Sequence, residues 1–177
     1  MRLGLPAKPS PLRTEQIILF RISSQIFAIS SASVQEVRSA DGLAGGTTEL
    51  NVPGIRKVRE ALRRGDNSVF IVNGAVHFGL PASQGMLVFV LRKTRTALLI
   101  DAIEKMTTMT RLQALPLSFC HEERNWYRGL TALDQIVVPV VHPDGFLTAE
   151  EVKLLDAALP PLESLPEATS PETPLPQ

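Results

Sequence analysis

Short apolar runs recur through the middle of this chain, and each is bounded by Gly, Ser, Asn, Asp or Pro. The runs are rich in β-branched side chains, which is the pattern of β-strands. Several place apolar residues side by side, as in strands that are covered on both faces in small closed barrels. The sequence therefore predicts a mainly β domain. The predicted strands are 16–22, 25–30, 68–72, 75–80, 86–92, 96–100 and 135–141.

Two other segments have helical periodicity. Residues 55–64 combine apolar and basic positions at helical spacing, which predicts a short amphipathic helix. A stronger helix is predicted at 148–159, where Thr148 and Glu151 can form a capping box and Pro160 stops the helix. The apolar stripe of this second helix consists of Val152, Leu155 and Leu159.

Proline marks the limits of the predicted folded unit. Of the 14 prolines, three lie in residues 1–13 and six in residues 159–177. Because proline has no amide hydrogen to donate, both ends are predicted to be flexible tails around one domain at 14–158. The C-terminal tail is interpreted as solvated, with a partner-docking peptide as the alternative. Its acidic residues, in a segment with no Lys or Arg, are Glu163, Glu167 and Glu172.

Charge and cysteine content exclude several classes of protein. Lys and Arg together number 18, as do Asp and Glu, so a globally basic nucleic-acid-binding protein is not expected. The single cysteine, Cys120, excludes an intramolecular disulfide framework and suits a reducing compartment. No apolar run approaches the roughly 20 residues that span a bilayer, and prolines interrupt the N-terminus. We therefore expect a cytoplasmic protein that does not insert into the membrane.

No group of residues has the pattern of a catalytic or metal site. Cys120 and His121 are adjacent, but neighbours in sequence rarely aim their side chains at one another, so we interpret them as loop residues. The three histidines share no metal-ligand spacing. Gly45 and Gly46 lack the strand, helix and lysine of a phosphate-binding loop. We expect no enzymatic activity, no cofactor and no metal.

The main concentration of charge is a basic cluster within 55–64. One interpretation is the solvated face of a short helix, and the other is a patch that binds an acidic surface. Nucleic acid fits poorly because no exposed aromatic residues accompany the cluster. The residues of the basic cluster are Arg56, Lys57, Arg59, Arg63 and Arg64.

The order of five motifs resembles that of CheW-like domains, over roughly residues 16–158. The closest match is VQEVR at 34–38, at the end of a segment that resembles the opening hairpin of the family. The other similar segments are Arg64-Gly65 with 68–72, ALLIDAIEKM at 97–106, RGLTALDQIVVPVV at 128–141, and AEEVKLLDAA at 149–158.

This resemblance implies a fold and a function. CheW-like domains consist of two small five-stranded β barrels, SH3-like or OB-like, that share a core and have no catalytic centre. They act as scaffolds in two-component signal transduction, where they bridge the cytoplasmic tip of chemoreceptors to the regulatory domain of a CheA-type histidine kinase. The resemblance thus implies a chemotaxis adaptor that works through protein–protein contacts at receptor arrays.

The resemblance also implies three partner-binding residues. Val34 and Glu36 match the strand that the family uses for contacts and, two residues apart, are expected to face the same side. The alternative is a core valine beside an exposed acid. Arg64 matches an arginine implicated in receptor coupling and could form a bidentate bond with a receptor carboxylate. Gly65 and Asp101 are expected to be structural, at a turn and at a strand end.

The chain departs from the family pattern at six positions, which leaves its choice of partners open. The competing hypothesis is a stand-alone β-barrel binding module that has lost kinase coupling. Such a module would bind another acidic protein or nucleic acid through residues 55–64. The six departures are Arg59, Leu62, Arg63, Asn73, Ala97 and His142.

Overall fold

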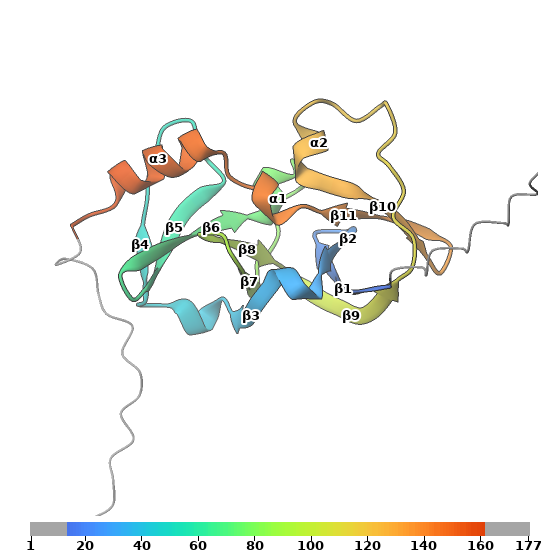
Figure 1. Cartoon of the computed structure of the whole chain (residues 1–177). Helices are drawn as coiled ribbons and strands as arrows, with labels where there is room; N and C mark the ends of the chain where they lie inside the picture. The colour runs from blue at the N-terminus through green and yellow to red at the C-terminus, as the bar shows by residue number, and fades with distance from the viewer. Residues whose placement is uncertain (1–13, 162–177) are drawn as a thin grey trace, which may run out of the picture.

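Two β-sheets make up most of the computed structural model, which describes residues 14–161 (Figure 1). The first sheet has five strands in the order β10-β11-β2-β1-β9, with neighbours antiparallel except for the parallel pair β11 and β2. The predicted tail at 1–13 and residues 162–177 of the predicted tail at 159–177 lie outside the described residues. The strands of the first sheet are β1 (Glu15–Ile22), β2 (Gln25–Ser30), β9 (Ala102–Met109), β10 (Tyr127–Leu133) and β11 (Ile136–Val141).

The second sheet has six strands in the order β3-β7-β8-β6-β5-β4, and its one parallel pair is β6 and β8. The family resemblance implied five strands here. The extra strand is the three-residue β4 at the edge of the sheet. The strands are β3 (Val34–Ser39), β4 (Thr47–Glu49), β5 (Val58–Arg64), β6 (Asn67–Asn73), β7 (Leu87–Leu91) and β8 (Thr96–Ile100).

Six short helical elements connect or cover the sheets in the described residues. Helix α3 lies beside the second sheet, and α1 lies in the region where the two sheets meet (Figure 1). The elements are η1 (Ser31–Ser33), η2 (Asp41–Leu43), α1 (Gly74–His77), α2 (Glu123–Trp126), η3 (Pro143–Gly145) and α3 (Ala149–Ala158).

The prediction of a mainly β domain is confirmed, but the strand predicted at 75–80 is wrong. Its first residues belong to the short helix α1. The Asn73 side chain begins this helix by accepting a hydrogen bond from the Val76 amide at 3.2 Å. Glycine at 74 is required by space, since a Cβ there would overlap the Ile22 side chain and the Leu99 carbonyl. The apolar run at 75–80 therefore begins as a helical turn and not as a strand, because Asn73 caps it and Gly74 lies close to Ile22 and Leu99.

The helix predicted at 55–64 is also wrong, because this segment contains strand β5. Val58 pairs with Val72 and Glu60 with Ile71, so Arg59 is an extra residue in a β-bulge. The bulge turns both Val58 and Ala61 toward the core. Strand residues three positions apart then face the same side, which imitates helical spacing.

One hydrophobic core is shared by the two sheets, as the family resemblance implied. Phe20 and Phe27 of the first sheet stack at 5.7 Å between ring centroids, and Phe20 meets Phe89 of the second sheet edge-on at 5.4 Å. Each sheet also encloses a smaller cluster of its own, which is the interior of a small barrel. The hydrogen-bonded ladders do not close fully. The edges of the first sheet meet at a single bridge between Gln113 and Leu130.

The helix predicted at 148–159 is confirmed as α3, and so is its capping box. The Glu151 amide donates to Thr148 Oγ1 at 3.1 Å, and the Thr148 amide donates to the Glu151 carboxylate at 2.9 Å. Leu155 is fully buried in the shared core. Asp156 accepts two bonds from the Arg95 guanidinium, at 2.8 and 2.6 Å, which fixes the helix to the β7–β8 loop.

Asp101 joins the two sheets, in agreement with its predicted structural role. Its carboxylate follows β8 and accepts the Ser23 amide at 2.6 Å and the Gly85 amide at 3.0 Å. Ser23 lies in the β1–β2 turn of the first sheet. Burial raises the pKa of Asp101, but these amide bonds more than offset the burial, so its pKa lies below the ordinary value.

Replacement of this carboxylate should weaken the fold in a pH-dependent way. Asp101→Asn has nearly the same shape, but its side chain has one acceptor oxygen where the carboxylate has two. We therefore expect the free energy of unfolding to fall by about 1–2 kcal/mol at pH 7. Because the folded pKa is depressed, the carboxylate stabilises the fold above its unfolded pKa and loses that effect as the pH falls below about 4. Urea unfolding at pH 7 and pH 3 measures the difference. Asp134→Asn, which removes only an exposed ion pair with Lys105, is the control. A deficit in Asp101→Asn that is unchanged at pH 3 would contradict this account.

Candidate partner-binding surface

Strand β3 carries two of the three predicted partner-binding residues, but it points them in opposite directions. Val34 pairs with Leu91, which belongs to the shared core, whereas Glu36 pairs with Val90, which belongs to the interior of the second barrel. A bulge between the two residues shifts the register by one. The expectation that they face the same side is therefore wrong. Val34 is 8% exposed and is a core residue, as the alternative interpretation had it.

Glu36 and Arg64, which are distant in sequence, are brought together by the fold. The Arg64 guanidinium lies 3.4 Å from one carboxylate oxygen of Glu36, and Arg38 Nε lies 3.9 Å from the other. Arg64 ends β5 and Glu36 lies on β3, the edge strand at the other side of the same sheet. The curled sheet thus brings β5 to β3, and the ion pair spans the seam that the hydrogen-bonded ladder leaves open.

The charged triad of Glu36, Arg38 and Arg64 remains accessible. About a third of each side chain is exposed, from 33% for Arg64 to 39% for Arg38. Exposed ion pairs contribute at most about 1 kcal/mol, so a partner carboxylate can replace Glu36 on an arginine at little cost. The triad therefore suits a surface that exchanges one ionic partner for another.

Gly65 forms a turn directly after Arg64, and its predicted structural role at a turn is confirmed. It begins the two-residue turn between β5 and β6 with φ of 59°, a backbone conformation that residues with a side chain seldom adopt. Its carbonyl also accepts a hydrogen bond from Arg63 Nε at 3.2 Å. A larger residue at 65 would strain the turn that sets the end of β5.

The basic cluster predicted at 55–64 is not one continuous face. Lys57 pairs with Glu151 of α3 at 3.1 Å, and Arg64 pairs with Glu36. Arg56 and Arg59 line a groove whose lining also includes Lys57. The interpretation of these residues as the solvated face of a short helix is therefore wrong, because Val58–Arg64 is a strand.

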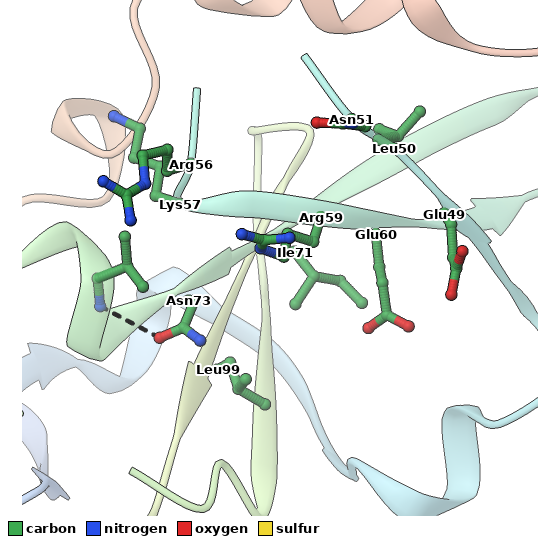
Figure 2. A pocket seen from close by; sticks show the side chains of 11 residues that line it. Glu49, Leu50, Asn51, Arg56, Lys57, Arg59, Glu60, Ile71, Asn73 and Leu99 are labelled. Atoms are coloured by element: carbon green, nitrogen blue, oxygen red, sulfur yellow. Dashed lines mark hydrogen bonds between the residues drawn. The ribbon is translucent and has the colours of Figure 1, made fainter. Parts of the chain in front are cut away.

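The groove beside β5 is the second feature of this surface, with a volume of about 680 Å³ (Figure 2). Basic side chains lie toward one end, where Arg56 and Lys57 precede β5 and Arg59 belongs to it. Glu49 and Glu60 lie toward the other end. The remaining lining is formed by Leu50, Asn51, Ile71, Asn73, Val76 and Leu99.

The six departures from the family pattern fall in different environments. Arg59 and Asn73 both line the groove. Leu62 and Ala97 are buried inside the second barrel, and His142 accepts the Asp144 amide at 3.3 Å at the start of η3. Arg63 bonds to Gly65, as described above. Only two of the six departures thus change the character of the groove.

Sequence reasoning missed the groove and the contact between Glu36 and Arg64. A strand prediction for 58–64 would have required recognition of the bulge at Arg59, for which the local sequence gives no turn residue. The ion pair joins residues on strands that are not neighbours in the sheet, so no spacing rule predicts it. Both features arise from the curl of the second sheet.

Within residues 14–161, no group of three or more His, Cys, Asp or Glu side chains is placed to hold a metal ion. The Cys120 thiol is exposed, and the Cys120 amide donates to the Glu123 carboxylate at 2.8 Å. No helix in this described part of the chain is both long enough and apolar enough to cross a membrane.

Two small β barrels that share one core, followed by a helix packed on the second barrel, define the CheW-like fold. A solved structure with this fold is that of the scaffolding protein TtCheW from Thermoanaerobacter tengcongensis. It matches with a TM-score of 0.62 and 11% sequence identity, over 77% of this chain and 95% of that chain. No protein-family model matches the sequence, and no curated protein matches it. The chain therefore has a CheW-like fold with a sequence far removed from that of TtCheW.

Proposed function

We propose that this protein is a non-enzymatic adaptor that couples chemoreceptors to a CheA-type histidine kinase in two-component signalling. The observation that carries the proposal is the match of almost the whole of the scaffolding protein TtCheW to this fold. The proposed partners are the cytoplasmic tip of the receptors and the regulatory domain of the kinase. The proposed location is the cytoplasm, at receptor arrays.

An adaptor of this kind works by binding two partners at once. Each barrel has a packed apolar interior, which favours a stiff domain. Little conformational entropy is then lost at each contact. Once one partner is bound, the other is held at a raised effective concentration near it. The charged triad is the proposed contact for one of these partners.

A three-component binding experiment tests the function. The purified protein is mixed with a receptor tip fragment and with the regulatory domain of a CheA kinase, separately and together. We expect binding to each, and we expect the kinase domain to sediment with the receptor fragment only when the adaptor is present. Binding to neither protein would overturn the proposal, and salt-sensitive binding to nucleic acid would instead support the binding-module hypothesis.

Charge reversal at Arg64 tests the proposed contact. If Arg64 binds a receptor carboxylate, Arg64→Glu places two like charges together and should raise the Kd for the receptor tip roughly 30-fold, or about 2 kcal/mol. The fold should be preserved, because the ion pair with Glu36 is exposed. Isothermal titration calorimetry gives the Kd, and circular dichroism checks the fold.

A charge swap separates a direct contact from a structural one. The double variant Glu36→Arg, Arg64→Glu restores an ion pair across the seam with its charges exchanged. If Arg64 contacts the receptor, the double variant should bind as weakly as Arg64→Glu. Recovery of wild-type affinity would mean that Arg64 only holds the seam, and the proposed direct contact would then be wrong.

A further inference from the structure

The groove beside β5 continues into a smaller hollow at one end of the second barrel. The groove and the hollow, which has a volume of about 190 Å³, share the lining residues Glu60, Ile71 and Leu99. Ile71 belongs to the apolar cluster that fills this barrel, and Leu99 packs against that cluster. The groove and hollow together therefore form the mouth of the second barrel, and small-ligand sites are common in such mouths. The hollow is completed by Ala40, Asp41, Leu43, Ala44, Thr47 and Val88.

The strand register points two carboxylates into this mouth. Glu49 pairs directly with Glu60, and Glu60 pairs with Ile71 of β6. Because paired residues of neighbouring strands share a face, both glutamates face the same side as Ile71, which is the barrel interior. Like charges directly opposite each other destabilise a sheet. Glu60 accepts a hydrogen bond from Thr47 Oγ1 at 3.3 Å, but neither carboxylate has a basic partner in residues 14–161. This end of the mouth therefore lacks the cation that would relieve the repulsion.

Two guanidinium groups lie toward the opposite end of the groove from the glutamates (Figure 2). Arg56 precedes β5, and Arg59, one of the departures from the family pattern, is the extra residue of its bulge. Both side chains are exposed, and neither forms an ion pair or a hydrogen bond within the described part of the chain. Lys57, at the same end, is already paired with Glu151. The mouth therefore presents unpaired negative charge at one end and unpaired positive charge at the other.

The rest of the lining combines apolar side chains with amide groups. Ile71 is 6% exposed, and Leu99 is partly buried beside it. The Asn73 carbonyl oxygen accepts the Val76 amide, which leaves its side-chain amide hydrogens to donate. The side chain of Asn51 has no partner in the described residues and can both donate and accept. Such amide side chains can form hydrogen bonds with the peptide groups of a ligand.

A complementary ligand has an ammonium group, a carboxylate and an apolar side chain. Because the acidic and basic ends of the mouth lie apart, the two charges of the ligand must also be separated. A free α-amino acid carries both charges on one carbon, whereas each residue of an extended peptide adds roughly 3.5 Å between its termini. The volume of the groove, about 680 Å³, lies in the range of small-molecule sites.

We infer that the mouth of the second barrel binds a zwitterionic peptide of two or three residues with apolar side chains. The N-terminal ammonium group of the peptide bonds to Glu49 and Glu60. Its C-terminal carboxylate bonds to Arg59, with Arg56 nearby, and one side chain packs on Ile71. The site does not depend on the proposed receptor and kinase contacts, and binding of those two proteins is measured separately.

Titration of the isotope-labelled full chain with leucyl-leucine tests the proposal by NMR. We expect saturable shifts of the Ile71 and Asn73 amide signals, while those of Ile136 and Val137 in the first sheet do not move. N-acetyl-leucyl-leucine lacks the ammonium charge and leucyl-leucine amide lacks the carboxylate. Each should raise the Kd roughly 10- to 100-fold, as expected for the loss of a charged hydrogen bond. Glycyl-glycine, which has no apolar side chain, should also bind at least about 10-fold more weakly.

Two double variants connect each charge of the peptide to one end of the mouth. Glu49→Gln with Glu60→Gln should bind leucyl-leucine and its acetylated form with the same Kd. Arg56→Gln with Arg59→Gln should bind leucyl-leucine and its amide with the same Kd. Glu122→Gln, at an exposed position outside the mouth, should keep both preferences of the wild type.

Thermal unfolding gives a second readout that needs no ligand. Glu49→Gln removes one of two opposed charges, so it should raise the Tm of the free protein by about 1–3 °C. Glu122→Gln should leave the Tm unchanged. An unchanged Tm in Glu49→Gln would show that the two carboxylates are not held against each other, and the proposed ammonium site would then be wrong.

Several results of the titration would overturn the proposal. One is the absence of saturable shifts at Ile71 and Asn73, or shifts of equal size at Ile136 and Val137. Another is the same Kd for leucyl-leucine, its acetylated form and its amide in the wild type. Free leucine that binds as tightly as leucyl-leucine would contradict a peptide as the ligand. None of these results would alter binding to the receptor tip or the kinase domain, so failure here is distinct from failure of the proposed function.

Discussion

Gly145→Ala should destabilise the protein by about 3 kcal/mol, at the upper end of the usual cost of overpacking. A Cβ at this position would fall well inside the van der Waals contact of the Asn125 carbonyl oxygen. That oxygen belongs to the backbone and cannot rotate away. The contact packs η3 against α2, next to the hydrogen bond from the His142 amide to the Trp126 carbonyl at 2.7 Å. The substitution must therefore separate the start of β10 from the segment that leads into α3.

Gly42→Ala is the matched control for this prediction. Neither glycine has a positive φ, and a Cβ at 42 would meet only Ser39 Cβ at 3.8 Å, an ordinary contact. Alanine there should be neutral or should stabilise the fold by about 0.4–1 kcal/mol, through the lower entropy of the unfolded chain. Urea denaturation of both variants gives the comparison. Equal stabilities for Gly145→Ala and the wild type would show that α2 and η3 are not packed as described.

Acid should destabilise the protein through His77, and replacement of His77 should remove that sensitivity. The ring lies among aromatic side chains, with centroids 4.7 Å from Phe78, 4.5 Å from Trp126 and 5.3 Å from Phe146. Its Nε2 has no hydrogen-bond partner in the described residues. Burial, helped by the positive charge of Lys57, lowers the pKa of His77 to about 3.

The sign of the effect follows from proton binding. Between the unfolded pKa near 6.5 and the folded pKa near 3, the unfolded chain binds a proton at this histidine and the folded chain does not. Stability therefore falls as the pH falls through this window. From pH 7 to pH 5 the loss due to His77 is about 2 kcal/mol, or roughly 4–8 °C in Tm.

Thermal unfolding at pH 7 and pH 5 measures this loss. His77→Phe keeps an aromatic ring among its neighbours and cannot titrate, and His77→Leu serves if the larger ring does not fit. Either variant should lose about 2 kcal/mol less than the wild type between the two pH values. His121→Gln, at an exposed histidine, should behave as the wild type does. Identical pH dependence in the wild type and in both His77 variants would contradict the burial of a neutral imidazole.

Much of the fold could be predicted from the sequence because local patterns determine it. The β-branched runs at 16–22, 25–30 and 96–100 form strands, since short apolar segments between turn residues can bury themselves in few other ways. The capping box of Thr148 and Glu151 is satisfied within one helical turn, so it needs no tertiary context. Asp101 could be assigned a structural role because a carboxylate at a strand end meets backbone amides.

The candidate surface could be predicted only in part. The resemblance indicated Glu36 and Arg64 separately, but no local rule placed the two side chains 3.4 Å apart. Bulges account for the main errors, because each inserts one residue and exchanges the two faces of a strand. At Arg59 the bulge made a strand look helical, and between Val34 and Glu36 it sent one side chain into the core and the other to the surface.

The amino-acid sequence by itself determined the class of fold, the C-terminal helix and the turn at Gly65, because each depends on interactions between near neighbours in the chain. Only the tertiary structure decided which charged side chains lie close together. It pairs Glu36 with Arg64 and Lys57 with Glu151, and it places Arg56 and Arg59 on the lining of the groove. Those pairings depend on how far the second sheet curls and on where its register shifts. Both are set by the packing of the shared core, which involves residues from nearly the whole length of the domain.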